Sequence, residues 1–260
     1  MKDKVVIITG ATKGIGESCV EVFSEAGAKI VACARGEKDG AELCKRIDAK
    51  FGEGTCTFMR CDVTSEEDIK NVVAKTVEKF GRIDCLLNNA GYHPGEEEID
   101  DISVEMFEQL LRLNLTSIFM FNKYALPYIR KQKGTIVNMG SLVHEIGQVC
   151  AIRYVSTKGA IASMTRAMAL DEAKYGVRVN CVSPGCIATP LTIEYMDSNP
   201  NPEKIRKANA AYAALDRHGL PREIANAMLF LASGMSTFIT GVDLPISGGS
   251  ELGYGMKHEI

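Results

Sequence analysis

The sequence predicts one α/β domain in which a parallel β-sheet is covered by helices on both faces. Three observations carry this prediction. The chain has 260 residues, of which 46% are hydrophobic and 24% charged, and this suits one large folded domain with a buried core. Short β-branched runs alternate with longer amphipathic stretches, which is typical of βαβ units. No linker, repeat or low-complexity segment interrupts this order.

The elements can be assigned in chain order from this alternation. In the first part we expect strands at 5–9, 29–33, 56–61 and 85–88, separated by helices at 15–26, 40–51 and 66–80. In the second part we expect helices at 104–130, 155–175 and 221–232, and strands at 135–138, 178–182 and about 241–246. Seven strands flanked by helices make a Rossmann-type, doubly wound sheet, and residues 1–260 form one domain.

Charge and cysteine content exclude several classes of partner. Thirty-three acidic residues against thirty basic ones give a net charge of -3, so no surplus of cations is available for nucleic acid. No apolar run approaches the length of a membrane span. The nine cysteines include no C-x-x-C pair, which favours reduced thiols over a disulfide framework or zinc site. We therefore expect a cytoplasmic protein without a metal ion.

A glycine-rich turn, T-G-A-T-K-G-I-G at 9–16, follows the first strand and opens the first helix. Glycines let the backbone approach a pyrophosphate, and the helix N-terminus offers free N–H groups. The alternative is an ordinary helix start with flexible glycines. The pattern predicts a dinucleotide phosphate site made by Gly10, Thr12, Lys13, Gly14, Ile15 and Gly16.

Further motifs follow along the chain: Asp62 after the third strand, N-N-A-G at 88–91 after the fourth, then Asn114, Ser141, the Y-x-x-x-K pair Tyr154 and Lys158, and Pro184-Gly185 with Thr189. With the glycine turn they resemble the full motif set of the short-chain dehydrogenase/reductase family, over essentially the whole chain. The resemblance implies four catalytic residues, Asn114, Ser141, Tyr154 and Lys158. It also implies a nicotinamide cofactor held by the glycine turn and by Asp62, Val63, Asn89, Ala90, Gly91, Tyr154, Lys158, Pro184, Gly185, Ile187 and Thr189.

These residue types suit the transfer of a hydride. A hydride leaves a carbinol carbon as the hydroxyl proton departs, so a base must lie within about 3 Å of that oxygen. Tyr154 is the candidate base, and Lys158, one helical turn later, would stabilise its phenolate. Ser141 would bind the substrate oxygen where negative charge develops. By resemblance, Asn114 holds a water that relays the proton through Lys158.

The end of the second strand indicates which cofactor is bound. NAD-binding proteins commonly carry a carboxylate there for the adenine ribose, but this strand ends in Ala34 and Arg35. Arg35 can pair with a 2′-phosphate, and Lys13 adds a second cation nearby. We therefore expect NADP(H). The alternatives are that both cations are simply solvated and that the same chemistry uses NAD(H).

The substrate-binding residues are predicted from three segments. The loop at His93, the stretch ending at Gln148 and the tail around Tyr254 resemble the 17β-hydroxysteroid dehydrogenases of the family, although Ala34-Arg35 departs from the NAD pattern of that match. His93 could equally cap its loop, Gln148 could be solvated, and Tyr254 could belong to a frayed tail. The segment 190–220, which includes Leu191, is either a substrate lid or plain packing.

The leading hypothesis is an NADP(H)-dependent oxidoreductase that interconverts a secondary alcohol and a ketone. The small-molecule substrate could be a steroid, another cyclic alcohol or a sugar. A catalytically idle NADP(H) sensor is the alternative, although it would not need the proton relay; an epimerase would need a different glycine turn. Apolar residues on more than one face of the helices at 104–130 and 155–175 predict a homotetramer or homodimer.

Overall fold

The computed structural model describes residues 1–258, within which seven parallel strands form one sheet. The strands are β1 (Val5–Thr9), β2 (Lys29–Ala34), β3 (Cys56–Arg60), β4 (Cys85–Asn88), β5 (Thr135–Met139), β6 (Arg178–Pro184) and β7 (Asp243–Ile246). The α-helices are α1 (Gly14–Glu25), α2 (Glu37–Phe51), α3 (Glu66–Phe80), α4 (Val104–Leu111), α5 (Ser117–Gln132), α6 (Val143–Ile146), α7 (Ile152–Ala173), α8 (Pro190–Asp197), α9 (Pro202–Ala211) and α10 (Pro221–Ala232). The predicted seven-stranded, doubly wound fold is confirmed.

The strand order is β3-β2-β1-β4-β5-β6-β7, so the chain winds outward from β1 and then returns to its other side. The winding therefore reverses between β1 and β4. In open parallel sheets, ligands bind at the carboxyl ends of the strands beside such a reversal. The loops after β1 and β4 are therefore the first place to look for a binding site.

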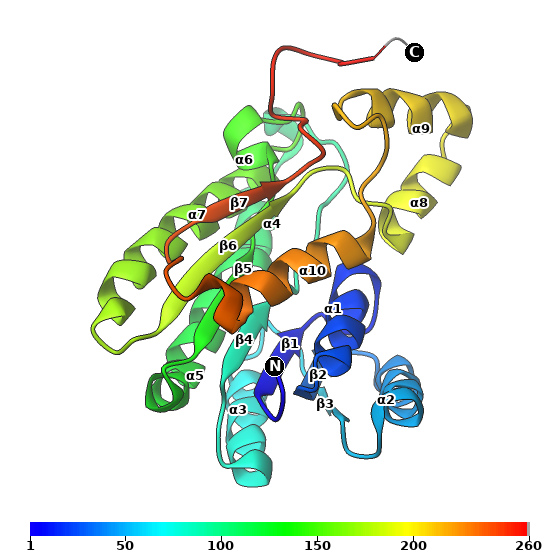
Figure 1. Ribbon diagram of the computed structural model, residues 1–260. Coiled ribbons are helices and arrows are strands. Elements are labelled where there is room, and N and C mark those ends of the chain that lie inside the picture. The colour runs from blue at the N-terminus through cyan, green and yellow to red at the C-terminus, as the bar shows by residue number, and fades with distance from the viewer. Residues whose placement is uncertain (259–260) are drawn as a thin grey trace.

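Two helical layers cover the sheet, one on each face (Figure 1). On one face, α1, α2 and α10 pack against the strands through a core that includes Phe23, Ile47 and Met228. On the other face, α3, α5 and α7 pack through a core that includes Phe121 and Ile129. The strands β1, β4 and β5 are buried along their whole length because helices lie on both sides of them.

Two segments differ from the elements expected from sequence. The helix expected at 104–130 is divided, because a π-helical turn (Arg112–Thr116) separates α4 from α5. The segment 190–220 is not a simple loop but contains α8 and α9, each with a proline in its first turn and a capping side chain before it, from Thr189 and Asn201. Both helices lie at one end of the molecule (Figure 1).

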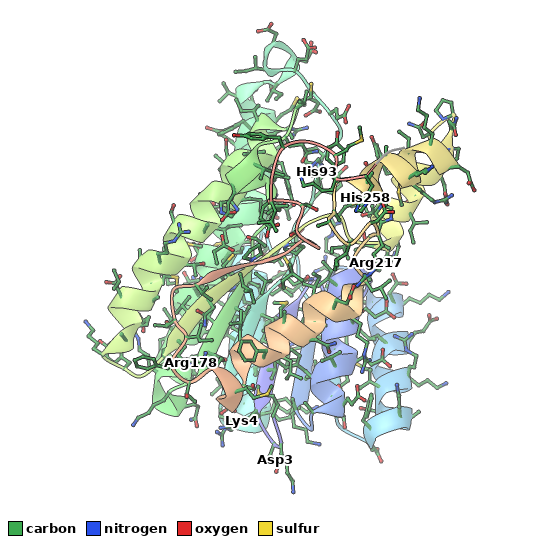
Figure 2. The ribbon with its side chains drawn as sticks, turned by 45° about the horizontal axis from the view of Figure 1, so that its top comes forward. Asp3, Lys4, His93, Arg178, Arg217 and His258 are labelled. Carbon is green, nitrogen blue, oxygen red and sulfur yellow. A yellow bond between two sulfur atoms is a disulfide. The ribbon has the colours of Figure 1, made fainter. Side chains whose placement is uncertain are left out.

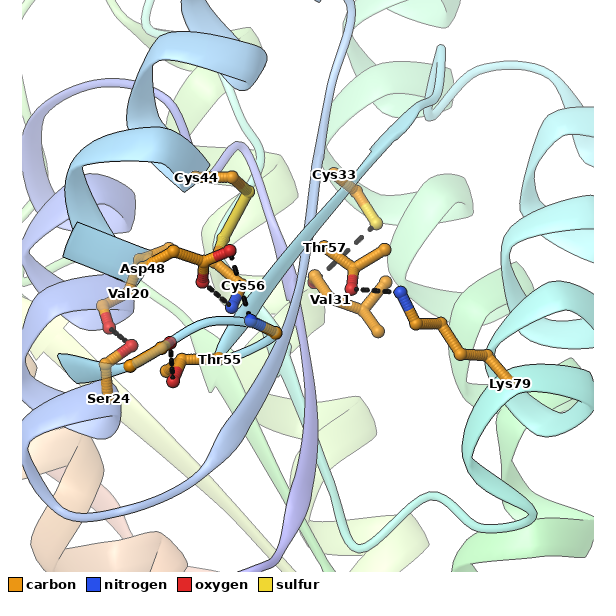
Figure 3. The surroundings of a disulfide bond; sticks show 12 residues. Val20, Ser24, Val31, Cys33, Cys44, Asp48, Thr55, Cys56, Thr57 and Lys79 are labelled. Carbon is orange, nitrogen blue, oxygen red and sulfur yellow. Dashed lines mark hydrogen bonds between the residues drawn. A yellow bond between two sulfur atoms is a disulfide. The ribbon is translucent and has the colours of Figure 1, made fainter.

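The cysteine prediction is wrong for one pair. Cys44 on α2 and Cys56 on β3 form a disulfide, with their Cα atoms 5.0 Å apart (Figure 3). Asp48 accepts hydrogen bonds from the N–H groups of Gly54 and Cys56, which holds the start of β3 against the end of α2. This close packing, rather than any cysteine spacing motif, brings the two sulfurs together. The other seven cysteines are free.

Across residues 1–258, no helix combines the length and the apolar character needed to cross a membrane.

Candidate active site

Most of the predicted site residues lie at the carboxyl end of the sheet, in the loops after the strands and on the helices beside them. Lys4 and Arg178 stand at the starts of β1 and β6, and Figure 2 shows His93 at the opposite end of the molecule from both. Because all seven strands are parallel, the loops that follow them lie at the same edge of the sheet, and residues far apart in sequence meet there.

The glycine turn after β1 has a backbone that other residues would resist. Gly10 and Gly14 have φ angles of +62° and +58°, in the left-handed region. A Cβ atom on Gly16 would lie 2.0 Å from the Gly10 carbonyl oxygen, so the turn can close only with glycine there. No side chain caps the N-terminus of α1. Its first N–H groups are therefore available to an anion such as a pyrophosphate.

Asn89, directly after β4, fixes the shape of this turn. Its Nδ2 donates to the carbonyl oxygens of Thr9 and Gly10, at 2.9 and 3.1 Å. In return, Thr9 Oγ1 accepts from the N–H groups of Asn89 and Ala90, at 3.0 and 2.9 Å. Four residues from two strand ends thus form one hydrogen-bonded unit, and the glycine cradle is organised before any ligand arrives.

Lys158 and Tyr154 project from α7 toward the end of β5. Lys158 is buried, and its Nζ donates to the carbonyl oxygen of Met139 at 2.9 Å. The same Nζ lies 5.4 Å from the centre of the Tyr154 ring. Ser141, also buried, follows β5 by two residues. The Tyr154 ring therefore lies near a buried, hydrogen-bonded cation, and a cation in this position would favour a phenolate.

Asn114 lies in the π-helical turn and faces the loop after β4. Its Oδ1 accepts from the N–H of Tyr92 at 2.9 Å, and its Nδ2 donates to the Tyr92 carbonyl oxygen at 2.9 Å. Nδ2 also lies 3.3 Å from Thr157 Oγ1, on the residue before Lys158. Gly91 separates the amide from the ammonium, since a Cβ there would lie 3.3 Å from Asn114 Oδ1 and 3.7 Å from Lys158 Nζ.

The loop after β6 meets the glycine turn from the other side. Thr189 lies against Gly14, where a Cβ would contact the Thr189 side chain at 3.4 Å, and its hydroxyl accepts from the N–H of Thr192 to cap α8. Gly185 passes close to Ser247, and buried Ile187 pairs with Gly219. The loop from Pro184 to Thr189 thus places the start of α8 against the dinucleotide turn.

Basic and acidic side chains lie together beside the glycine turn, where the adenosine part of a dinucleotide is expected. Arg35 is exposed and forms no ion pair within residues 1–258, whereas Lys13 pairs with Asp39 at 3.4 Å. Hydrogen bonds from Thr64 hold the pKa of the Asp62 carboxyl below its usual range, and the nearby Arg35 and Arg60 lower it further. Val63, beside Asp62, is buried. Arg35 is therefore available to bind a phosphate, whereas Lys13 is already paired with the Asp39 carboxylate.

His93 lies directly beside Tyr154. Their ring centres are 4.2 Å apart, and His93 Nε2 lies 3.0 Å from Gln148 Oε1. The structure thus brings together three of the predicted substrate residues. It does not bring in Leu191, which is half exposed on α8, or Tyr254, whose side chain is 102% exposed.

Comparisons with known proteins agree with this geometry. A family model described as enoyl-(acyl carrier protein) reductase matches residues 10–251. L-fucose dehydrogenase of Bos taurus is 47% identical over 254 residues, covering 98% of this chain and 92% of the relative. The chain belongs to the short-chain dehydrogenase/reductase family. The predictions of this family and of an oxidoreductase are confirmed.

Two solved structures show the same fold. Cj0485 dehydrogenase superimposes with a TM-score of 0.90 at 32% identity, covering 97% of this chain and 96% of the other. ElxO with NADP bound gives a TM-score of 0.88 at 30% identity, with 96% and 99% covered. The more specific resemblance to 17β-hydroxysteroid dehydrogenase type 14 stays a prediction.

Sequence reasoning missed a set of buried polar residues that lie beneath this site and support the elements that form it. Asn88 Nδ2 donates to Asn122 Oδ1 and Asn138 Oδ1 at 2.8 and 2.9 Å, and Asn138 Nδ2 donates to Thr165 Oγ1 at 3.0 Å. These buried side chains join β4, α5, β5 and α7, which carry or adjoin the predicted catalytic residues. A polar residue inside an otherwise apolar strand was the available signal, since buried amides need partners.

A surface cavity of about 590 Å³ lies next to the active site. Gln148, Val155 and Glu97 are among its lining residues, but Ser141, Tyr154 and Lys158 are not. The reacting atoms are therefore outside it, and we do not take it as the substrate cleft.

Proposed function

We propose that this protein is an NADP(H)-dependent oxidoreductase that interconverts a secondary alcohol and a ketone. The observation that carries the proposal is the buried Lys158 ammonium, 5.4 Å from the Tyr154 ring at the end of the sheet where the glycine cradle lies. An idle sensor would have no use for a buried cation beside a tyrosine, because burying a charge is costly.

The nicotinamide cofactor supplies the hydride acceptor or donor. Tyr154 accepts the hydroxyl proton during oxidation and returns it to the carbonyl oxygen during reduction. Lys158 stabilises the phenolate form, and Ser141 donates a hydrogen bond to the substrate oxygen. Asn114 is hydrogen-bonded to both the N–H and the carbonyl oxygen of Tyr92, and by the family resemblance it would hold a water that relays the proton through Lys158.

The glycine turn fits a dinucleotide, because Gly16 leaves a space that a Cβ would fill and α1 offers uncapped N–H groups. The free Arg35 supports NADP(H), as does the similarity to ElxO, whose structure holds NADP. A charge-assisted hydrogen bond to the 2′-phosphate contributes about 1.5–3 kcal/mol. Replacing Ala34→Asp with Arg35→Ile should therefore shift the kcat/KM ratio toward NAD by about tenfold or more. A native preference for NAD would refute this assignment.

Among the substrate classes, we favour a sugar or another hydroxyl-rich ring over a steroid. His93 and Gln148 are hydrogen-bonded to each other beside Tyr154, so polar groups that a substrate hydroxyl could join lie next to the proposed acid/base residue. The Bos taurus relative is an L-fucose dehydrogenase, which agrees with this preference. The exposed apolar residues Leu191, Ile193 and Tyr195 on α8 support the proposal that 190–220 closes over the bound substrate.

The test is a panel of sugars, cyclic alcohols and hydroxysteroids assayed with each cofactor, together with Tyr154→Phe. This variant should keep cofactor binding but lose about a hundredfold or more in kcat, because it removes only the acid/base oxygen. Tyr128→Phe, on α5, is the matched control and should retain full activity. A Tyr154→Phe variant that keeps more than about a tenth of the rate would contradict the mechanism.

We further propose that the reductase is a homodimer or homotetramer. Phe119 on α5 and Leu170 on α7 are 52% and 81% exposed, although Phe121 and Ile161 on the same helices are buried in the core. An apolar surface of this kind favours a symmetric contact. Tyr254 would then reach a neighbouring subunit's cleft instead of its own. Light scattering should give a multiple of the chain mass, and a monomer would overturn both statements.

A further inference from the structure

Three possible metal ligands meet beside the catalytic serine loop. His144 and Glu145 lie on α6, and Asp243 begins β7. His144 Nε2 is 3.0 Å from Asp243 Oδ2 and 3.9 Å from Glu145 Oε1, and the three ligand atoms all lie within 4.8 Å of one another. None of the three belongs to the catalytic set or to the dinucleotide cradle.

Asp243 is the first sign that a ligand belongs here. Its side chain is only 3% exposed, yet its Oδ2 has no hydrogen-bond partner. The short contact to His144 therefore lacks the geometry of a hydrogen bond. Asp243 Oδ1, in contrast, accepts from Ser183 Oγ at 2.6 Å, which fixes the carboxylate. A buried carboxylate oxygen without a donor is costly, so a cation should compensate it.

His144 is the second sign. Its Nδ1 lies 2.6 Å from the carbonyl oxygen of Ser141. A carbonyl only accepts, so Nδ1 carries the proton in this contact. In the neutral ring, the Nε2 lone pair then faces the Asp243 carboxylate at 3.0 Å, and the two repel each other unless positive charge stands beside both. Histidines that bind metals show this arrangement, with the other ring N–H donated to a backbone carbonyl.

We propose that His144 Nε2, Asp243 Oδ2 and a Glu145 carboxylate oxygen bind a divalent transition-metal ion, for which Zn²⁺ is the best match. One imidazole and two carboxylates are ligands that Zn²⁺ accepts. Glu145 is half exposed, so the ion has an entry path from solvent. The bound ion joins α6 to β7, and through His144 it holds the backbone of the catalytic Ser141.

The experiment uses the full chain, stripped with a chelator and then titrated with Zn²⁺ or Co²⁺ by calorimetry and visible absorption. One ion per chain should bind, and the Co²⁺ spectrum should show a nitrogen and oxygen ligand field without thiolate bands. His144→Gln and Asp243→Asn should each weaken affinity by at least about tenfold, as even loss of an outer partner does. His258→Gln, which removes an exposed histidine, is the matched control and should bind normally.

Glu145→Gln should fold normally, because the Glu145 side chain is half exposed. This variant should also bind the ion more weakly. Far-UV circular dichroism checks that each variant is folded. If the stripped protein binds no ion, the proposal is overturned. The contact between His144 and Asp243 would then be explained by a doubly protonated His144 ring that pairs with the carboxylate. Binding that survives in both His144→Gln and Asp243→Asn, or thiolate bands in the Co²⁺ spectrum, would overturn it equally.

Discussion

Replacing Gly16 with alanine should damage the dinucleotide cradle severely. The new Cβ would lie 2.0 Å from the Gly10 carbonyl oxygen and 2.6 Å from Asn89 Nδ2, whereas real Cβ atoms essentially never come closer than 3.0 Å. The turn must therefore open by about 1 Å, since overlap of this size cannot be relieved by a flexible side chain. Asn89 holds both Thr9 and Gly10, so its two hydrogen bonds are strained by the same movement.

The magnitude follows from these contacts. Overpacking costs about 1–3 kcal/mol, and each of the two weakened hydrogen bonds costs about 1 kcal/mol, so the unfolding free energy should fall by about 3–5 kcal/mol. The Kd for NADPH should rise by at least about tenfold, because the phosphate contacts depend on the same backbone. Urea denaturation and NADPH fluorescence measure the two quantities. Gly234→Ala is the control, since a Cβ there meets nothing within 4 Å. If Gly16→Ala matches that control in both assays, the steric argument is wrong.

Three further predictions concern charge and cross-linking. Asp39→Asn should tighten NADPH binding modestly, because it frees Lys13 from its ion pair; unchanged affinity would place Lys13 outside the site. Replacing both Cys44 and Cys56 with serine should lower the unfolding free energy by about 3 kcal/mol through loop entropy, and urea denaturation that shows no loss would contradict the cross-link. Hydrogen bonds from Arg217 lower the pKa of Glu223 from 4.5 to about 2. Its stabilisation is therefore complete above pH 4.5 and lost as the pH falls toward about 2, so the stability gap between the wild type and Glu223→Gln should close over that range.

The sheet could be predicted from sequence because strand and helix periodicities are local. Most element ends agree within a few residues, and Pro221–Ala232 agrees fully, since proline marks the first turn of α10. The break between α4 and α5 could not be predicted from sequence. A π-helical turn is only a local widening of the helix, so the helical spacing of apolar residues continues before and after it.

The site was predictable to the extent that each motif follows its own strand. Groups that meet only through packing were missed. Lys13 lies in the turn before α1, whereas its partner Asp39 lies on α2. Cys44 lies on α2 and its partner Cys56 on β3. The cluster of His144 and Asp243 depends on where β7 lies beside β6, which no local pattern gives.

The charges around the predicted adenosine end bear on how this oxidoreductase could prefer NADP(H), as proposed, with the Asp39 carboxylate nearby. Lys13 and Asp39 are 74% and 47% exposed, and such a pair contributes less than about 1 kcal/mol in water. A 2′-phosphate bound by Arg35 gains about 1.5–3 kcal/mol from one charge-assisted hydrogen bond. A hydrogen bond of the same kind from Lys13 to the phosphate would exceed the Lys13–Asp39 pair, so Lys13 could leave Asp39 for the phosphate at a net gain. On the proposed function, Asp39 would therefore lower the affinity for the phosphate without reversing the preference, whereas Arg35, which has no ion-pair partner among residues 1–258, would set it.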